Sequence, residues 1–282
     1  MLDKIKYSLK HLTVGRVIIY IFLTLGAIVM FFPFYWMITG AFKTYFEVTA
    51  FPPVWWPSSF NLDNFVTAFN MAPFMTYFKN SVIAMVGSVG LCTFTTILAS
   101  FAFSKLKFPG QHIIFGLLLG LMMVPFEMII ITNYRTIIDI KIYNTIFALI
   151  IPFTSSIFYT YILKGFFDSI PDSLYQAARV DGCSNWKYLW RIMVPIARPS
   201  LVTIILLNAI ASWNSFMWPM LAVVDKDLRT LPFGLYAFVS EGGAETQLMM
   251  AASTIIVVPM IILFLFARKQ IVNGVARGGL KG

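Results

Sequence analysis

Few residues of this chain have the types and spacing that catalysis or metal binding requires. The two histidines, His11 and His112, have no metal-ligand neighbour at helical spacing, and no serine has a plausible histidine and aspartate partner. The sequence contains no G-x-x-x-x-G-K-S/T pattern, the P-loop that holds nucleotide phosphates. Cys92 lies in an apolar run and Cys183 in a polar loop, so we expect neither a disulfide nor a metal site. The chain alone is therefore expected to have no enzymatic activity and no cofactor.

Glu127 is the only carboxylate well inside one of the long apolar runs. A charge within a bilayer is costly unless it faces protein or water, so an intramembrane carboxylate marks a functional site by default. A role in a substrate path is one interpretation. The alternative, that the carboxylate reaches water at the outer leaflet or pairs across a subunit interface, stays open.

A second set of candidates lies together on the apolar run 199–224. Amide side chains hydrogen-bond polar solutes, and an indole ring stacks on sugars. Both residue types also have a structural interpretation, because amides form hydrogen bonds between membrane helices and an indole packs helices together. These candidates for the substrate path are Asn208, Trp213 and Asn214.

The composition indicates that a membrane holds these residues. Hydrophobic residues make up 59% of the chain and charged residues 12%, with a mean hydropathy of +0.80, whereas a soluble domain has about 25% charged residues. We predict an all-α, polytopic membrane protein with six transmembrane helices, each longer than the about 20 residues needed to cross a bilayer. The predicted spans are 17–42, 80–104, 112–134, 142–163, 199–224 and 246–267.

The positive charges predict how the chain is oriented. All but six of the 21 Lys and Arg residues fall on the side of the two termini, which the positive-inside rule places in the cytoplasm. The net charge of +9 therefore follows from membrane topology, and no nucleic-acid partner is expected. This orientation predicts a cytoplasmic N-terminus (1–16), an external loop (43–75), a transmembrane core (76–267) with a cytoplasmic loop at 169–198, and a cytoplasmic tail (268–282).

The cytoplasmic loop begins with the signals of a short helix. Ser169 is predicted to cap this helix, with Asp172 returning the hydrogen bond and Pro171 in the first turn. Gly182 is predicted to end the helix in a left-handed conformation. Such a helix is about 15 Å long, too short to cross a bilayer of about 30 Å.

The second half of the loop is predicted to form another helix. Ser184 caps it, and the helix runs to Met193, before Pro195 and Pro199 break the helical pattern ahead of the next span.

The first helix has the features of a docking surface for another protein. Its alanine pair removes side-chain bulk, so a partner is able to approach the backbone closely. Polar and aromatic side chains around this flat surface are predicted to serve as anchors. The alternative is an ordinary solvated connector. The residues concerned are Tyr175, Gln176, Ala177, Ala178, Arg179, Asp181 and Gly182.

This stretch resembles the EAA loop of ABC-importer permeases. The family pattern is EAA, three residues, G, nine residues and I-x-L-P, and Ile192 and Pro195 match its end. Gln176 stands where glutamate is usual and Val194 where leucine is usual, so a salt bridge often made by that glutamate is replaced here by a hydrogen bond at most. The resemblance implies that this loop docks on an ATPase.

Further segments resemble the carbohydrate branch of these permeases, the MalG-like subunits of maltose-type importers. They include Asn80-Ser81, the run AFAFSKLKFPG, Ser212-Trp213-Asn214 and the glycine-rich C-terminus. The match runs from about residue 75 to the end of the chain. It implies a type I ABC-importer transmembrane domain in a bacterial or archaeal plasma membrane.

The resemblance also implies partners. These are a second homologous permease, two ATPase subunits that bind ATP and magnesium, an extracellular solute-binding protein and a carbohydrate substrate. The rival interpretation is a self-sufficient secondary transporter. Such proteins usually show internal repeats and buried ionisable groups, and this sequence shows neither beyond Glu127.

Gly182→Asp is expected to uncouple transport while leaving membrane insertion intact. A side chain is strained in the left-handed conformation predicted for this position, so the docking turn would be distorted. The measurement is substrate uptake at matched membrane abundance. Normal uptake in this variant would count against a role for the loop.

Overall fold

The computed structural model describes residues 14–240 and 243–279. The described part is mostly helical, as predicted, apart from a short antiparallel ribbon of β1 (Val239–Ser240) and β2 (Gly243–Ala244). The beginning of the predicted cytoplasmic N-terminus and the end of the predicted tail lie outside the described residues.

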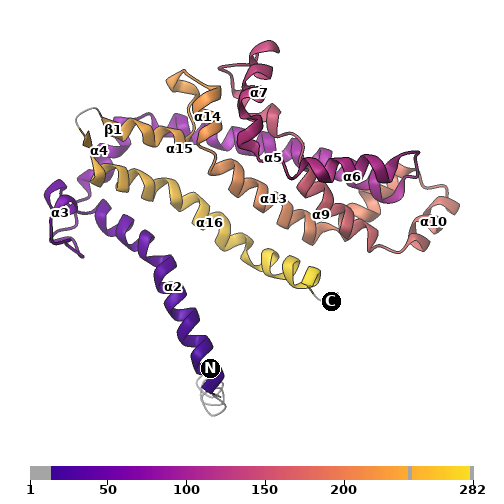
Figure 1. The fold of residues 1–282 in the computed structure, drawn as a ribbon, viewed down its shortest axis with the longest axis horizontal. Coiled ribbons are helices and arrows are strands. Elements are labelled where there is room, and N and C mark those ends of the chain that lie inside the picture. The colour runs from indigo at the N-terminus through magenta and orange to yellow at the C-terminus, as the bar shows by residue number, and fades with distance from the viewer. Residues whose placement is uncertain (1–13, 241–242, 280–282) are drawn as a thin grey trace. The chain divides into compact units, whose positions relative to one another are not determined.

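The chain forms two compact units, whose elements are labelled in Figure 1. Unit 1 comprises Met1–Met71 and Ala237–Val257, and unit 2 comprises Ala72–Tyr236 and Val258–Gly282. The helix α16 (Thr246–Gly279) belongs in part to each unit. The other helices of unit 1 are α2 (Val14–Ala41), α3 (Tyr45–Thr49) and α4 (Asp63–Met71). The helices of unit 2 are α5 (Phe74–Lys105), α6 (Gln111–Leu121), α7 (Phe126–Asp139), α8 (Ile146–Ile150), η1 (Ile151–Phe153), α9 (Ile157–Asp168), α10 (Asp172–Val180), α11 (Asn185–Tyr188), the π-helix η2 (Leu189–Met193), α12 (Val194–Ile196), α13 (Arg198–Trp213), α14 (Met217–Ala222), η3 (Lys226–Leu228) and α15 (Leu231–Gly234), with η4 (Leu235–Phe238) at the border of the two units.

Within the described residues, only α2 and α5 are long and apolar enough to span a membrane as single helices. Three helix pairs reach that length together, and each is bent at a short break: α6 with α7 by 101°, α8–η1 with α9 by 44°, and α11–α12 with α13 by 80°. Helices thus lie at all six predicted apolar runs, but by length and composition the described part supplies two to five candidate spans.

The bend between α6 and α7 follows from Pro125, which precedes the first residue of α7. Proline has no backbone N–H and disfavours helical geometry at the residue before it, so a continuous helix cannot form there. Glu127 therefore lies in the first turn of α7, with an exposed side chain, and not in the middle of a straight span. The free N–H groups of a helix start favour a negative charge at this position.

The central element of unit 2 is α5, which packs against α8, α9, α13 and α15. One face of α5 carries small buried residues at a spacing of four: Ser88, Cys92, Thr96 and Ser100. Ser100 Oγ donates to the carbonyl of Thr160 on α9 at 3.0 Å, so this face hydrogen-bonds a neighbouring helix as well as packing against it. Small residues allow close helix approach, which is how membrane helices associate.

The predicted external loop of unit 1 contains the helices α3 and α4 and is held by buried polar contacts. Lys43 is fully buried, and its Nζ donates to the carbonyl of Val54 and lies 4.2 Å from the ring centroid of Trp36. Asn64 Nδ2 donates to the carbonyls of Ala41 and Lys43. Most of α2 itself is exposed within this chain.

Glu47 closes the same loop. Its carboxylate accepts from the backbone N–H of Thr44 at 2.8 Å and of Ser58 at 2.9 Å, and the Thr44 hydroxyl completes a capping box for α3. A hydrogen bond from the Ser58 side chain, followed by the two backbone bonds, lowers the pKa of Glu47 to about 2.

Glu47→Gln is expected to destabilise this loop by about 1 kcal/mol at pH 7. Because folding lowers the pKa of Glu47, the carboxylate adds stability above its ordinary pKa of 4.5, and this stability is lost as the pH falls towards 2. The difference between the variant and the parent should therefore shrink as the pH falls below 4.5 and vanish below about 2. The measurement is amide hydrogen exchange of residues 44–58, with Asp63→Asn as the control for charge loss. A difference at pH 2 as large as the one at pH 7 would contradict the assignment.

Candidate functional site

The C-terminal end of α10 has the geometry predicted for it. Gly182 adopts a φ of +70°. Its N–H donates to the carbonyl of Arg179 at 3.1 Å, and the N–H of Cys183 donates to the carbonyl of Ala178 at 2.8 Å. These two bonds are the Schellman pattern, which satisfies the last carbonyls of a helix. Ser184 Oγ accepts from the N–H of Lys187 at 3.3 Å, so its predicted cap on the second helix is also confirmed.

The start of α10 differs from the prediction. Ser169 ends α9, and its Oγ donates to the carbonyl of Phe166 at 2.7 Å instead of capping α10. Pro171 precedes α10, and no side chain caps the helix. The predicted reciprocal bond from Asp172 is therefore wrong, because a stronger partner draws its carboxylate away.

That partner is Lys105, the last residue of α5. Its side chain is 3% exposed, and Nζ donates to Asp172 Oδ1 at 2.6 Å and to the carbonyl of Ile170 at 2.9 Å. The hydrogen bond from Lys105, reinforced by its charge, lowers the pKa of Asp172. One ammonium thus holds the junction between α9 and α10 against the end of α5.

The two faces of α10 are unlike. Tyr175 and Ala178 face the protein interior: the Tyr175 hydroxyl donates to Asn185 Oδ1 at 2.8 Å, and Ala178 belongs to an apolar core shared with α5, α9 and α13. Ala178 is thus buried and Tyr175 half-buried, and their part in docking stays a prediction. The exposed residues of the predicted set are Gln176, Ala177, Arg179, Asp181 and Gly182. Val180 joins them with 88% of its surface exposed.

The second helix continues beyond its predicted end. After α11 the chain forms the π-helix η2 and then α12, which contains Pro195. Pro195 thus lies within a continuous helical path, just after the π-helical turn. The helical path therefore bends only around Ala197, and Pro199 lies in the first turn of α13.

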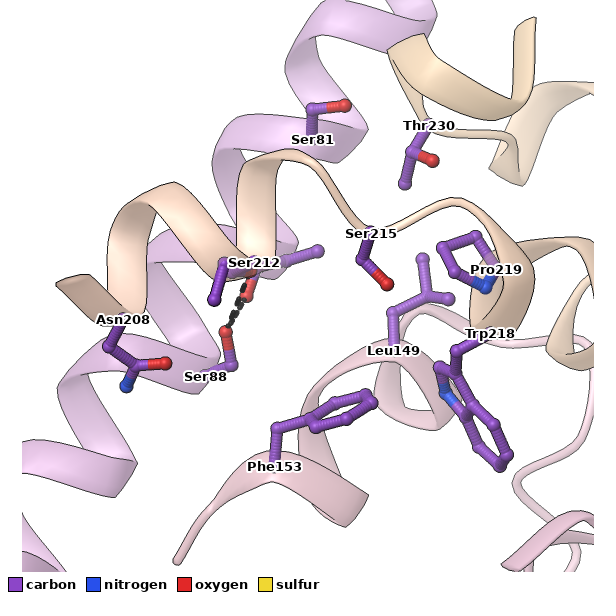
Figure 2. Close-up of a pocket in the computed structure, with 12 residues that line it drawn as sticks. Ser81, Ser88, Leu149, Phe153, Asn208, Ser212, Ser215, Trp218, Pro219 and Thr230 are labelled. Atoms are coloured by element: carbon purple, nitrogen blue, oxygen red, sulfur yellow. Dashed lines mark hydrogen bonds between the residues drawn. The ribbon is translucent and has the colours of Figure 1, made fainter. Parts of the chain in front are cut away.

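A cavity of about 120 Å³ lies among α5, α8, η1, α13 and α14 in unit 2. Figure 2 shows Ser88 and Ser212 pointing towards each other from α5 and α13, with their Oγ atoms 3.2 Å apart. The lining contains no charged side chain. Its polar members are Ser81, Ser88, Asn208, Ser212, Ser215 and Thr230, and its aromatic members are Phe153 and Trp218.

Two buried polar atoms at this cavity have no hydrogen-bond partner among the described residues. They are Asn208 Nδ2, whose amide lies beside the weakly accepting Cys92 thiol, and Thr230 Oγ1. Buried polar groups are rarely left unpaired in proteins. The cavity therefore offers one amide donor and one hydroxyl to a polar, uncharged ligand or to water.

The indole of Trp218 lines one wall of the cavity and is held there by a hydrogen bond. Its Nε1 donates to the carbonyl of Ala148 at 2.9 Å. In a regular helix that carbonyl would accept from the residue four positions later, but that residue is Pro152, which has no N–H. The indole supplies the missing donor and fixes its own ring beside the cavity.

Of the predicted path residues, the structure brings only Asn208 to this cavity. Trp213 is buried and packs on Phe78, with ring centroids 5.9 Å apart, while Asn214 is the exposed C-cap of α13. Asn208 and Asn214 are six residues apart, which is about 240° around a helix, so they face different sides. Glu127 does not line the cavity.

Sequence reasoning missed the hydroxyl groups. Ser81 and Ser88 are seven residues apart on α5, two helical turns on one face, and both line the cavity. This spacing was the available signal. No sequence pattern indicated that Thr230 lines the cavity. It lies in the polar loop, which is held against α5 by tertiary contacts that include the bond from Leu231 N–H to Ser81 Oγ.

The fold and the site are those of a helical membrane protein that has a cavity between its helices and a short helix, α10, with an exposed outer face. The family described as binding-protein-dependent transport system inner membrane component matches residues 13–277. The chain belongs to this family of inner membrane components of binding-protein-dependent transport systems.

Named relatives and a solved structure agree with this assignment. The chain is 35% identical to "Probable ABC transporter permease protein YurM" of Bacillus subtilis, with 95% of this chain and 90% of the relative covered. It is 30% identical to the arabinooligosaccharides transport system permease protein AraQ of Halalkalibacterium halodurans, with 92% and 96% covered. A crystal structure of a bacterial ABC transporter involved in the import of the acidic polysaccharide alginate has the same fold, with a TM-score of 0.80, 21% identity, and 90% and 95% covered.

Trp218→Phe is expected to destabilise the protein by about 1–3 kcal/mol through the buried carbonyl left without a donor. The control is Trp213→Phe, because the Trp213 indole is equally buried but its Nε1 has no partner in the described part of the chain. The measurement is thermal unfolding of both variants in the same detergent. Equal losses would show that ring volume, not the hydrogen bond, matters at Trp218.

Proposed function

We propose that this chain is the permease subunit of an ATP-binding-cassette importer and forms half of the translocation pathway for a carbohydrate. The observation that carries the proposal is the placement of the short helix α10. Its outer face is exposed, and its inner face packs onto α5, α9 and α13. Such a helix suits transmission of a force from outside the bundle. The named functions of the relatives, which include uptake of sugars, support the carbohydrate class.

The proposed contact with the ATPase is the outer face of α10. It consists of the exposed residues Gln176, Ala177, Arg179, Asp181 and Gly182, together with Val180. Tyr175 and Ala178 support this face from behind. ATP and magnesium are bound by the separate ATPase, so this chain needs no cofactor of its own and performs no hydrolysis.

The proposed contact with the sugar is the hydroxyl-lined cavity. Its hydroxyls and the Asn208 amide match the alternating donors and acceptors of a sugar, and the faces of Phe153 and Trp218 suit sugar rings. Trp213 supports α13 by packing on Phe78. Asn214 and Glu127 are exposed in this chain and do not line this cavity, so this proposal gives them no contact with the sugar.

The proposed assembly contains a second homologous permease, two ATPases and an external solute-binding protein. The family description names dependence on a binding protein, which supports the last of these. In this assembly the chain has six membrane-crossing segments, several of them bent, with both termini in the cytoplasm of a bacterial or archaeal cell.

The test is uptake in sealed vesicles, using the sugar retained by the binding protein that copurifies with the complex. We expect uptake to require ATP on the side of the ATPase and to survive collapse of ion gradients. Uptake driven by an ion gradient with the ATPase removed would replace this proposal with a secondary transporter.

Asn208→Ala is expected to raise the KM for sugar uptake about 2- to 10-fold, because one hydrogen bond to the substrate is lost. Asn214→Ala is the matched control, since it removes the same amide from the same helix at a position away from the cavity. Its KM should stay within about twofold of the parent value. Equal effects of the two variants would remove Asn208 from the proposed path.

A further inference from the structure

The start of α10 depends on another helix for its position. Its preceding residue, Pro171, makes no side-chain cap, and Ser169 is occupied by α9. The bonds that hold this junction come from Lys105, which reaches both the Ile170 carbonyl and the Asp172 carboxylate. The orientation of α10 relative to α5 therefore depends on this ammonium at its N-terminal end, in addition to the apolar core that contains Ala178.

This contact differs from an ordinary surface ion pair. The Lys105 side chain is 3% exposed and that of Asp172 is 76% exposed. A buried ammonium that loses its partner is costly, so the contact is strongly favoured while the carboxylate is present. Two bonds from one nitrogen also resist rotation better than a single bond does.

The other end of this connection leads to the cavity. α5 is a single helix of 32 residues without an internal proline. Ser88, which lines the cavity, and Lys105 lie on this same helix and are about 25 Å apart at a helical rise of 1.5 Å per residue. A displacement of the Lys105 end of α5 therefore moves the cavity wall directly.

We propose that the Lys105–Asp172 pair is the joint that transmits movement of α10 into α5 and so reshapes the cavity. This inference rests on the proposed function, because it assumes that an ATPase moves α10. Lys105 and Asp172 are positioning residues in this scheme: they touch neither nucleotide nor sugar.

The chain offers a matched control for this joint. Lys164 Nζ and Asp168 Oδ2 form a second ion pair of the same length, 2.6 Å. It lines the same polar cavity of about 840 Å³ as the Lys105–Asp172 pair. Both of its members belong to α9, four residues apart, so the ion pair itself joins no two helices. Lys164 Nζ also lies 5.1 Å from the ring centroid of Phe115 on α6, a contact that Asp168→Asn leaves in place.

The experiment follows the cavity with a thiol reporter and needs no substrate. Ser88→Cys is introduced into a chain carrying Cys92→Ala and Cys183→Ser, and the complex with its copurifying ATPase is placed in vesicles. The rate of modification by a charged methanethiosulfonate reagent is measured without nucleotide and with ATP plus vanadate. Asp172→Asn, Lys105→Met and Asp168→Asn are then compared in this background.

We expect ATP and vanadate to change the modification rate of the reporter. Asp172→Asn and Lys105→Met should reduce this change about 2- to 30-fold, the range for residues that couple distant sites. Asp168→Asn should leave it intact, and all three should retain the ATPase on purification. Lys105→Met guards against misfolding, because it leaves no buried charge and its former partner is already exposed.

Each contrary outcome has a distinct meaning. If the reporter background itself shows no response to ATP, the proposed function fails and the joint with it. If the reporter background responds to ATP, and Asp172→Asn and Lys105→Met respond as strongly as that background, only the proposed joint is overturned. The joint is also overturned if Asp168→Asn reduces the response of the reporter as much, because the cause would then be the loss of any carboxylate in this region. Loss of the bound ATPase from Asp172→Asn or Lys105→Met overturns it too, because the cause would then be a failure of assembly.

Discussion

Helices in a bilayer gain little from burying apolar surface against one another, because lipid is as apolar as the helix face. Their association depends on close approach and on hydrogen bonds between them. In this protein that requirement is met by the buried small face of α5, which includes Ser88, Cys92, Thr96 and Ser100. The hydroxyl of Ser100 bonds α9, and that of Ser88 meets Ser212 of α13. The architecture of unit 2 is arranged around this face.

The cavity and the projecting helix are both consequences of that arrangement. Where small residues of α5 face small residues of α13, the side chains do not fill the space, and a hydroxyl-lined cavity remains. At the other end of α5, Lys105 is drawn into the protein and holds the junction before α10. One helix thus connects a surface suited to an energy-supplying partner with a space suited to a polar solute. In Figure 1, α10 lies at the end of unit 2 away from α15.

Broken helices in this bundle are stabilised by specific substitutes for the lost backbone bonds. At Pro152 the orphaned carbonyl of Ala148 receives the indole N–H of Trp218. At Pro125 the helix restarts without a side-chain cap, and the negative charge of Glu127 in the first turn interacts favourably with its free N–H groups. Since unpaired backbone groups are costly in lipid, irregular backbone persists only where protein or water satisfies it. These breaks therefore mark positions where the backbone contacts protein or water and not lipid.

The sequence by itself determined the features that depend on local chemistry. The apolar runs, the left-handed Gly182 and the cap at Ser184 follow from composition or from neighbours within a few residues, and the motif around α10 identified the family. Tertiary structure decided the rest. The partner of Asp172 lies 67 residues away on α5, so a favourable local cap was displaced by a buried ammonium that no local pattern reveals. The cavity, likewise, unites residues as distant as Ser81 and Thr230. Such sites form where helices pack together. The contacting segments are far apart in the sequence, and no local sequence pattern indicates that they will contact each other.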